Sequence, residues 1–138
     1  MAGKFSFSVI SPERVVFQGD VEAVYAPGWE GEFGVLPGHA PYLVLLKIGA
    51  IRFQKDGKWT HAAISAGLCE VDYASMKILA ETCELSNEID KERARLAKER
   101  AEQALKTEEK KEEESFQGAQ AALERALNRL KVAEKGLG

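Results

Sequence analysis

The sequence is poor in the residues that mark several classes of protein. It has only two cysteines among 138 residues, Cys69 and Cys83, which is too few for a disulfide framework, and their spacing matches no metal-binding motif. No apolar run approaches the length of about 18–20 residues that a membrane span requires, and the longest candidate is Tyr42–Leu46. The net charge of −3 argues against nucleic acid as a partner, because phosphate binding needs a basic face. These absences predict a soluble protein of a reducing compartment.

The composition divides the chain into two parts. All four prolines and ten of the eleven aromatic residues lie before residue 89. Of the 50 residues in the range 89–138, 23 are charged. We therefore expect a first domain over residues 1–84, where β-type patterns prevail, and a second domain over residues 85–138.

The first part shows the pattern of short β-strands. Phe5, Phe7 and Val9 alternate with polar residues, which is the period of a half-buried strand. Turn residues separate nearly all of the β-rich runs that follow, which are Val15–Phe17, Val21–Ala26, Phe33–Leu36, Tyr42–Leu46, Ile48–Gln54, Lys58–Ser65, Leu68–Asp72 and Met76–Ala80. Asp56-Gly57 predicts a tight type I′ hairpin turn, because glycine tolerates a positive φ. The pattern predicts a β-sandwich of ten strands, or at least eight.

No catalytic constellation is present in this part. The densest group of glycines is Gly28, Gly31, Gly34 and Gly38. A phosphate-binding loop would require a helix after the glycines, and a strand pattern follows Gly38 instead, so we interpret them as tight turns at the edge of the sandwich. His39 and His61 share no set of partners, and no nucleophile, base and orienting group can be assembled. We expect neither catalysis nor a metal site here.

From Ile89 onward the apolar spacing changes to three and four, the period of an α-helix. The recurring residues are Ala94, Ala97, Ala101, Ala104 and Leu105 in a first helix, and Phe116, Ala119, Leu123, Ala126, Leu130 and Ala133 in a second. We expect Ser86 or Asn87 to cap the first helix and the acidic run at 108–114 to form the connecting turn or a fraying helix end. This predicts an antiparallel helical hairpin, which alanine contacts hold together only weakly.

Four arginines of the helical part are spaced so that they can face one surface. Arg93 and Arg100 are seven residues apart, which places them on one face about 10 Å apart along the axis, and Arg125 and Arg129 are four apart. In an antiparallel hairpin they could converge beside alanines, an arrangement suited to phosphate oxygens and a planar base. The alternative is an ordinary helix surface, on which arginines pair with glutamates three or four residues away.

Three stretches of the chain have a more specific pattern. They are Gly31-Glu-Phe-Gly-Val-Leu-Pro-Gly-His-Ala-Pro41, Ile89-Asp90-Lys91-Glu92-Arg93-Ala94 and Arg125-Ala-Leu-Asn-Arg-Leu-Lys-Val-Ala-Glu134. In this order they resemble the ε subunit family of the rotary F-type ATP synthases, and the resemblance covers essentially the whole chain.

The resemblance implies a non-catalytic rotor subunit on the cytoplasmic face of a bacterial cell membrane, attached to the membrane only through its complex. The sandwich would couple the γ subunit to the c-ring in proton-driven ATP synthesis, with Glu32, Gly38 and His39 in this contact. The hairpin would either fold down on the sandwich or extend into the catalytic α/β ring, and the extended form would block ATP hydrolysis.

Several bacterial members of this family bind ATP in the folded form. The resemblance places that site on Glu84, Asp90, Arg93, Ala94, Arg100, Arg125 and Arg129. The arginines would hold the phosphates, the turn Ile89–Ala94 the base and sugar, and the two carboxylates would accept hydrogen bonds or orient arginines. ATP would be a regulatory ligand without an obligatory magnesium ion. The alternative is a structural adaptor whose hairpin stays docked and binds no nucleotide.

Overall fold

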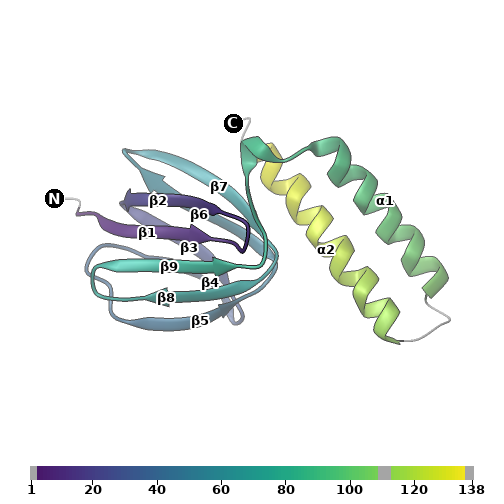
Figure 1. Cartoon of the computed structure of the whole chain (residues 1–138), viewed down its shortest axis with the longest axis horizontal. Coiled ribbons are helices and arrows are strands. Elements are labelled where there is room, and N and C mark those ends of the chain that lie inside the picture. Colours follow the sequence, from purple (N-terminus) through teal and green to yellow (C-terminus); the bar gives the residue numbers. More distant parts are fainter. Residues whose placement is uncertain (1–2, 109–112, 136–138) are drawn as a thin grey trace.

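The computed structural model describes residues 3–108 and 113–135, and it shows a β-sandwich followed by two helices (Figure 1). The strands are β1 (Phe5–Ile10), β2 (Val15–Val21), β3 (Ala23–Gly28), β4 (Gly31–Val35), β5 (Tyr42–Leu46), β6 (Gly49–Lys55), β7 (Lys58–Ile64), β8 (Gly67–Val71), β9 (Ser75–Ala80) and β10 (Cys83–Leu85). A turn of 3-10 helix, η1 (Ser86–Glu88), precedes the helices α1 (Lys91–Glu108) and α2 (Glu113–Lys135). The predicted ten-stranded sandwich and helical hairpin are confirmed.

The strands form one sheet that nearly closes on itself. Their order is β10-β7-β6-β3-β5-β8-β9-β1-β2, and β4 pairs with β3. All described pairs are antiparallel except β1 with β9. The edge strand β2 contacts β6 and β10 on the opposite side, so the sheet folds over into two layers that share one core.

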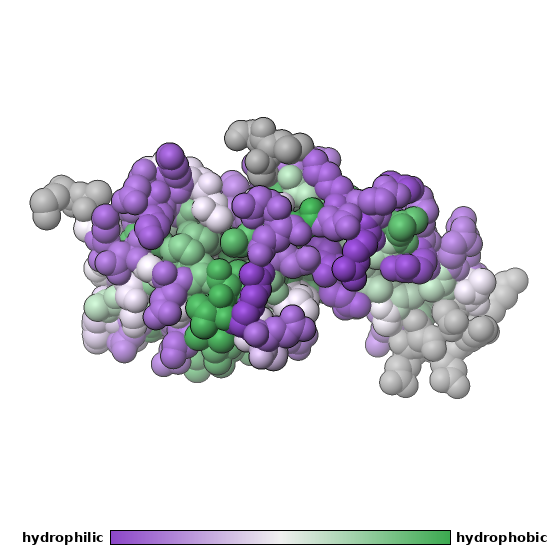
Figure 2. Space-filling view, turned by 45° about the horizontal axis from the view of Figure 1, so that its top comes forward, coloured by the Kyte–Doolittle hydropathy of each residue, from purple (hydrophilic) through white to green (hydrophobic). Residues whose placement is uncertain are grey.

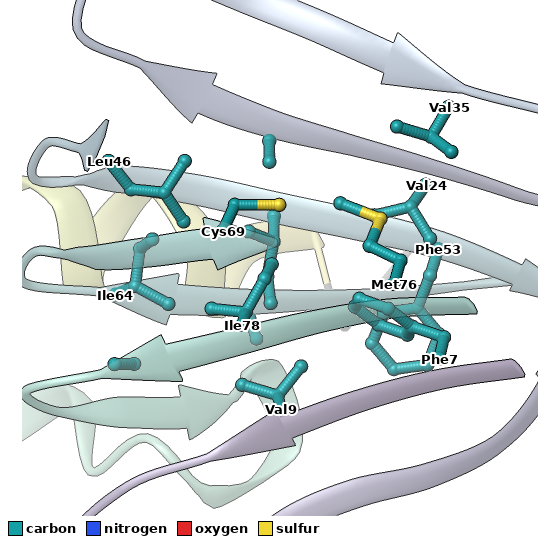
Figure 3. Packing of buried hydrophobic residues seen from close by; sticks show 14 of the residues in the cluster. Phe7, Val9, Val24, Val35, Leu46, Phe53, Ile64, Cys69, Met76 and Ile78 are labelled. Atoms are coloured by element: carbon teal, nitrogen blue, oxygen red, sulfur yellow. The ribbon is translucent and has the colours of Figure 1, made fainter. Parts of the chain in front are cut away.

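The core is built from the inward faces of these strands (Figure 3). The alternation predicted for β1 is confirmed, since Phe5, Phe7 and Val9 are all buried. The rings of Phe7 and Phe53 lie 5.2 Å apart between centroids, and Phe17 lies 4.4 Å from Phe53. Burial of such side chains contributes about 1.5–3 kcal/mol each, so this cluster is the main source of stability for the sandwich.

The hairpin turn predicted at Asp56-Gly57 is confirmed. Both residues have positive φ, 52° and 77°, as a type I′ turn requires, and the turn closes the pairing of Lys55 with Lys58. The Glu22 carboxylate accepts hydrogen bonds from the backbone N–H groups of Asp56, at 3.0 Å, and Gly57, at 2.9 Å. Glu22 directly precedes β3, so these hydrogen bonds attach the turn to the start of that strand.

The predicted role of the glycine cluster is only partly correct. Gly28 and Gly31 pair with each other and close the turn between β3 and β4, and Gly38 has a φ of 84° in the loop after β4. Gly34, however, lies inside β4, where an added Cβ would be 2.7 Å from the Tyr25 ring. This glycine is required by side-chain packing and not by a turn.

The predicted cap of the first helix is wrong. Ser86 and Asn87 belong to η1, and the Oδ1 of Asp90 instead accepts a hydrogen bond from the Arg93 N–H at 3.1 Å, as an N-cap does. The reason is β10, which the strand pattern did not predict and which extends the sheet to Leu85. The chain needs a further turn to leave the sheet before a helix can begin.

The two helices pack through small side chains. The predicted seam is confirmed, with Ala94, Ala101, Ala119 and Ala126 buried. Only α2 contacts the sandwich closely, at β6 and β7, and α1 lies on the side of α2 away from the sheet (Figure 1). Helix α1 ends at Glu108, and α2 begins at Glu113. Most of the predicted acidic turn, residues 109–112, therefore lies outside the described residues.

The start of β8 provides a test of the sheet packing. A Cβ at Gly67 would lie 2.4 Å from the backbone oxygen of Leu79, so Gly67→Ala forces two strands apart and should destabilise the protein by about 1–3 kcal/mol. Gly118→Ala is the matched control, because nothing lies within 4 Å of a Cβ there and alanine favours a helix by about 1 kcal/mol. Urea unfolding followed by circular dichroism measures both. An unchanged midpoint for Gly67→Ala would contradict this packing.

Candidate functional site

The seven residues predicted to bind nucleotide line two adjoining pockets at the base of the hairpin. The first, here called the linker pocket, is lined by Glu84, Glu88, Ile89, Asp90, Arg93, Ala94 and Arg129. The second, here called the alanine pocket, is lined by Ala97, Arg100, Ala101, Ala104, Ala119, Ala122, Arg125, Ala126 and Arg129. Arg129 lines both pockets, so the structure brings all seven residues into one region. Nucleotide binding there remains a prediction.

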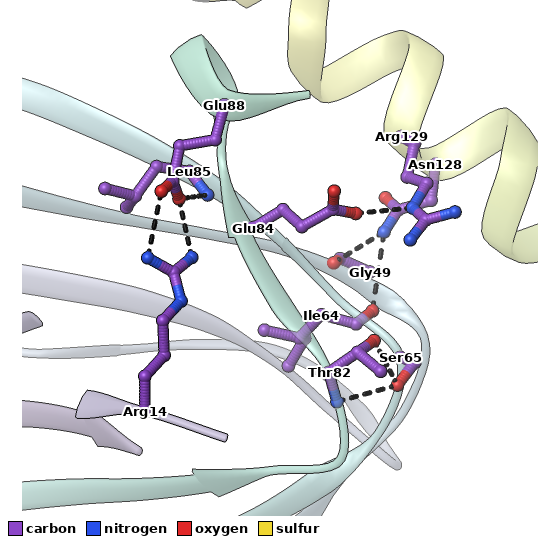
Figure 4. A network of polar contacts seen from close by, with 10 residues as sticks. All are labelled: Arg14, Gly49, Ile64, Ser65, Thr82, Glu84, Leu85, Glu88, Asn128 and Arg129. Atoms are coloured by element: carbon purple, nitrogen blue, oxygen red, sulfur yellow. Dashed lines mark hydrogen bonds and ion pairs between the residues drawn. The ribbon is translucent and has the colours of Figure 1, made fainter. Parts of the chain in front are cut away.

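The two carboxylates of the set have different local roles. The Nε of Arg129 donates a hydrogen bond to the Glu84 Oε1 at 2.5 Å, which joins α2 to β10 (Figure 4). Asp90 acts on the helix start, where its side chain accepts from the Arg93 N–H and its carbonyl from the Ala94 N–H at 3.0 Å. Glu84 therefore orients an arginine side chain, while Asp90 fixes the backbone that presents Arg93.

Three arginines of the set have no acidic partner. Within the residues that the structure describes, Arg93, Arg100 and Arg125 make no ion pair and no side-chain hydrogen bond. Arg95, on another face of α1, pairs with Glu92 and Glu99. The pairing with glutamates three or four residues away, considered from the sequence, thus describes Arg95. The side-chain N–H groups of Arg93, Arg100 and Arg125 stay available to an anion.

The alanine pocket has the dimensions of a ligand site. Its volume is about 340 Å³, within the range of about 300–1,000 Å³ that is common for small-molecule pockets. Six alanines and three arginines line it, so its walls are apolar and its polar groups are all cationic. Such a recess favours a planar apolar group that carries negative charge.

Two polar contacts of this region were not predicted. The Nδ2 of Asn128 on α2 donates to the Gly49 carbonyl at 2.8 Å, and Arg14 donates two hydrogen bonds to Glu88, at 2.9 and 2.7 Å. Glu88 also accepts from the Leu85 N–H at 3.0 Å. Sequence patterns did not indicate either contact, because Asn128 and Gly49 are 79 residues apart and Arg14 and Glu88 are 74 residues apart.

The residues predicted for the rotor contact lie at the two ends of β4. Glu32, near its start, is exposed, and its Oε1 lies 3.7 Å from the Arg52 guanidinium. Gly38 and His39 belong to the loop after the strand, where the His39 ring packs edge-on against Phe5. Both ring nitrogens of His39 are buried and lack a partner among the described residues. The structure therefore separates these residues along one strand and does not gather them in a pocket.

The outer face of the sheet exposes an apolar stripe. Leu43 and Leu45 on β5 and Leu79 on β9 are 66%, 57% and 46% exposed. Leu68 of β8 pairs in register with Leu45 on one side and with Leu79 on the other, so the stripe continues across three strands. Figure 2 shows hydrophobic surface on the sandwich and mainly hydrophilic surface on the hairpin. Contiguous exposed apolar area of this kind marks a protein interface.

No three potential metal ligands of the His, Cys, Asp and Glu types lie together in residues 3–108 and 113–135. Neither described helix combines the length and the apolar character needed to cross a membrane.

Comparisons with known proteins cover nearly the whole length of the chain. The family model described as ATP synthase, Delta/Epsilon chain, beta-sandwich domain matches residues 4–86, and the one described as the long alpha-helix domain matches 87–134. The ATP synthase epsilon chain of Desulforamulus reducens is 43% identical over 97% of this chain and 100% of its own. That of Geotalea daltonii is 47% identical over 98% and 97%.

A solved structure agrees with the fold. A chain in the cryo-EM structure of the Euglena gracilis mitochondrial ATP synthase superposes with a TM-score of 0.79 at 24% identity. The match covers 98% of this chain and 82% of that one.

The contact between Arg14 and Glu88 gives a pH-dependent prediction. Hydrogen bonds from Arg14 hold the pKa of the Glu88 carboxyl below its usual value of 4.5, so Arg14→Met should raise this pKa. A depressed folded-state pKa stabilises the protein above the unfolded-state pKa, and the effect is lost as pH falls through the folded-state value. Arg14→Met should therefore lower the urea midpoint at pH 7 and leave it unchanged once Glu88 is protonated.

NMR titration of the Glu88 side chain and urea unfolding at both pH values measure these effects. Lys4→Met is the matched control, because its ammonium pairs with Asp56 at 3.4 Å and not with Glu88. A loss of stability that is equal at both pH values would mean that Arg14 acts through packing instead of charge.

Proposed function

The chain belongs to the family of ATP synthase epsilon chains, non-catalytic subunits of that enzyme, and we propose that its hairpin is a nucleotide-sensitive regulator. In this proposal ATP binds the linker and alanine pockets and stabilises the folded hairpin. Without ATP the hairpin is free to extend toward the catalytic α/β subunits and inhibit hydrolysis. The observation that carries the proposal is the convergence of Arg100, Arg125 and Arg129 on one alanine-lined pocket beside Arg93.

The charge of the pockets supports a polyphosphate ligand. Arg93, Arg100 and Arg125 have no acidic partner among the described residues, and guanidinium groups bind phosphate oxygens in two-pronged fashion. The arginines would hold the phosphates, and the segment Ile89–Ala94 would contact the base and sugar. Because the arginines supply the positive charge themselves, the site has no need of a magnesium ion.

The ligand would act on the hairpin because its contacts come from three elements. Arg93 and Arg100 lie on α1, Arg125 and Arg129 on α2, and Glu84 on β10. A molecule that binds this folded arrangement alone stabilises it, by about 1.4 kcal/mol at ten times its dissociation constant. That suffices to shift a hairpin whose folded and extended forms are nearly balanced.

One observation favours a second function, that of a structural adaptor with a permanently docked hairpin. Arg129 is bonded to Glu84, and Asn128 is bonded to the sheet at Gly49. These contacts hold α2 on the sandwich. The adaptor and the regulator differ in whether nucleotide and hairpin position are linked.

The sandwich would provide the rotor contacts in both cases. The apolar stripe of Leu43, Leu45 and Leu79 supports a protein partner, for which we propose the γ subunit. We propose that the ends of β4, with Glu32 and the Gly38-His39 loop, meet γ and the c-ring. The chain would then couple γ to the ring in proton-driven ATP synthesis, at the cytoplasmic face of a bacterial membrane.

Calorimetric titration of ATP into the purified chain tests the nucleotide site. We expect saturable one-to-one binding with or without magnesium. Arg125→Ala should weaken it by about tenfold or more, since a hydrogen bond to a charged group contributes about 1.5–3 kcal/mol. Arg95→Ala is the matched control, because Arg95 is paired with Glu92 and Glu99 and lines neither pocket, and it should change the affinity less than twofold. Equal losses in both variants would show that the site is misplaced.

Removal of the hairpin tests regulation. A chain that ends at residue 88, assembled into the ATP synthase, should raise the ATP hydrolysis rate severalfold over the full-length chain, because no helix remains to extend. Assembly of the complex, checked by subunit stoichiometry, is the control. An unchanged hydrolysis rate would favour the adaptor.

A further inference from the structure

Asn128 on α2 makes a polar contact with the backbone of the sheet. Its Nδ2 donates to the Gly49 carbonyl at 2.8 Å and reaches the Ile64 carbonyl at 3.5 Å (Figure 4). Gly49 and Ile64 are register partners in β6 and β7, so one amide group contacts both strands at the end of their ladder. The side chain is half-buried between helix and sheet.

This contact constrains the helix in two directions. A shift of α2 by one residue moves the amide by about 1.5 Å along the axis and rotates it by about 100°. Either change takes the Nδ2 atom away from the two carbonyls and leaves polar groups unsatisfied at an apolar contact. Asn128 therefore selects one axial position and one rotation for α2.

The same helical turn presents the nucleotide-site arginines. Arg125 and Arg129 flank Asn128 in sequence, and all three line a cavity of about 90 Å³ between α2 and the sheet, together with Ser65 and Thr82. Arg129 has a second anchor in Glu84, whereas Arg125 has none among the described side chains. The position of Arg125 is therefore set by the placement of α2 itself.

We propose that Asn128 is a positioning residue of the nucleotide site, which fixes the register of α2 on the sheet and thereby holds Arg125 at the alanine pocket. The part that concerns nucleotide rests on the proposed function above. The part that concerns docking rests on the contacts of Asn128 alone. Neither the amide nor its carbonyl partners line the linker or the alanine pocket, so Asn128 acts through its neighbours.

The substitution Asn128→Ala tests the positioning role without weakening α2 itself, because alanine has a higher helix propensity than asparagine. In the full chain we expect about tenfold weaker ATP binding by calorimetry. In an Arg125→Ala background the same change should cost less than twofold, because the side chain to be positioned is gone. Gln120→Ala, on an exposed part of α2, is the matched control and should leave ATP binding unchanged in both backgrounds. Equal losses for Asn128→Ala in both backgrounds would overturn the positioning role.

A second measurement separates this proposal from the proposed function. Hydrogen exchange of α2 without ATP should be faster in Asn128→Ala than in the unaltered chain and in Gln120→Ala. If the unaltered chain fails to bind ATP, the nucleotide proposal is refuted, and the exchange rates still decide whether Asn128 docks α2. Unchanged exchange in Asn128→Ala would overturn the docking itself.

Discussion

The contact between α1 and α2 is made by small side chains, and the arrangement of the hairpin depends on this contact. Alanine lets two helix backbones approach closely but removes little apolar area from water, at about 25 cal/mol per Å². Ala94, Ala101, Ala119 and Ala126 are buried in this way, and no large side chain fills the space between the helices near Arg100 and Arg125, where the alanine pocket opens. The small side chains that limit the buried area also leave room for the alanine pocket, so in the proposed function the stability of the hairpin and the binding of a ligand would depend on the same residues.

Because α1 lies away from the sheet, the hairpin is attached to the sandwich through α2 alone. The hydrogen bonds of this attachment join Asn128 to the Gly49 carbonyl and Arg129 to Glu84, and Val132, one helical turn after Asn128, is buried. A neutral hydrogen bond contributes about 0.5–1.5 kcal/mol, and one between charged groups, such as Arg129 and Glu84, about 1.5–3 kcal/mol. The proposed function requires that these contacts leave the docked hairpin near balance with a released one, because a ligand of moderate affinity changes the population only under that condition.

The sequence predicted the parts of the structure that depend on local patterns. Alternation in β1, the Asp56-Gly57 turn and the alanine seam each need only neighbouring residues. Strand β10 could not be found this way, because it is three residues long and is defined by pairing with β7. Without β10 the sequence places the helix cap at Ser86 or Asn87, whereas the observed cap is Asp90.

The site residues followed from spacing and family resemblance, but the pairing of each arginine with an acidic residue depends on distant chain segments. Asn128 and its partner Gly49 are 79 residues apart, and no local pattern links them.

Glu84 of β10 and Glu88 of η1, which lead into α1, have opposite attachments. Glu84 is bonded to Arg129 of α2, and Glu88 is bonded to Arg14 in the turn between β1 and β2. The hairpin release that we propose would break the first contact but not the second, since both Arg14 and Glu88 belong to the sandwich side of the linker. The chain would then stay fixed up to Glu88, and a released hairpin would turn about the next residues, Ile89 and Asp90. These same residues line the linker pocket, so a ligand bound there would contact the point at which the hairpin turns.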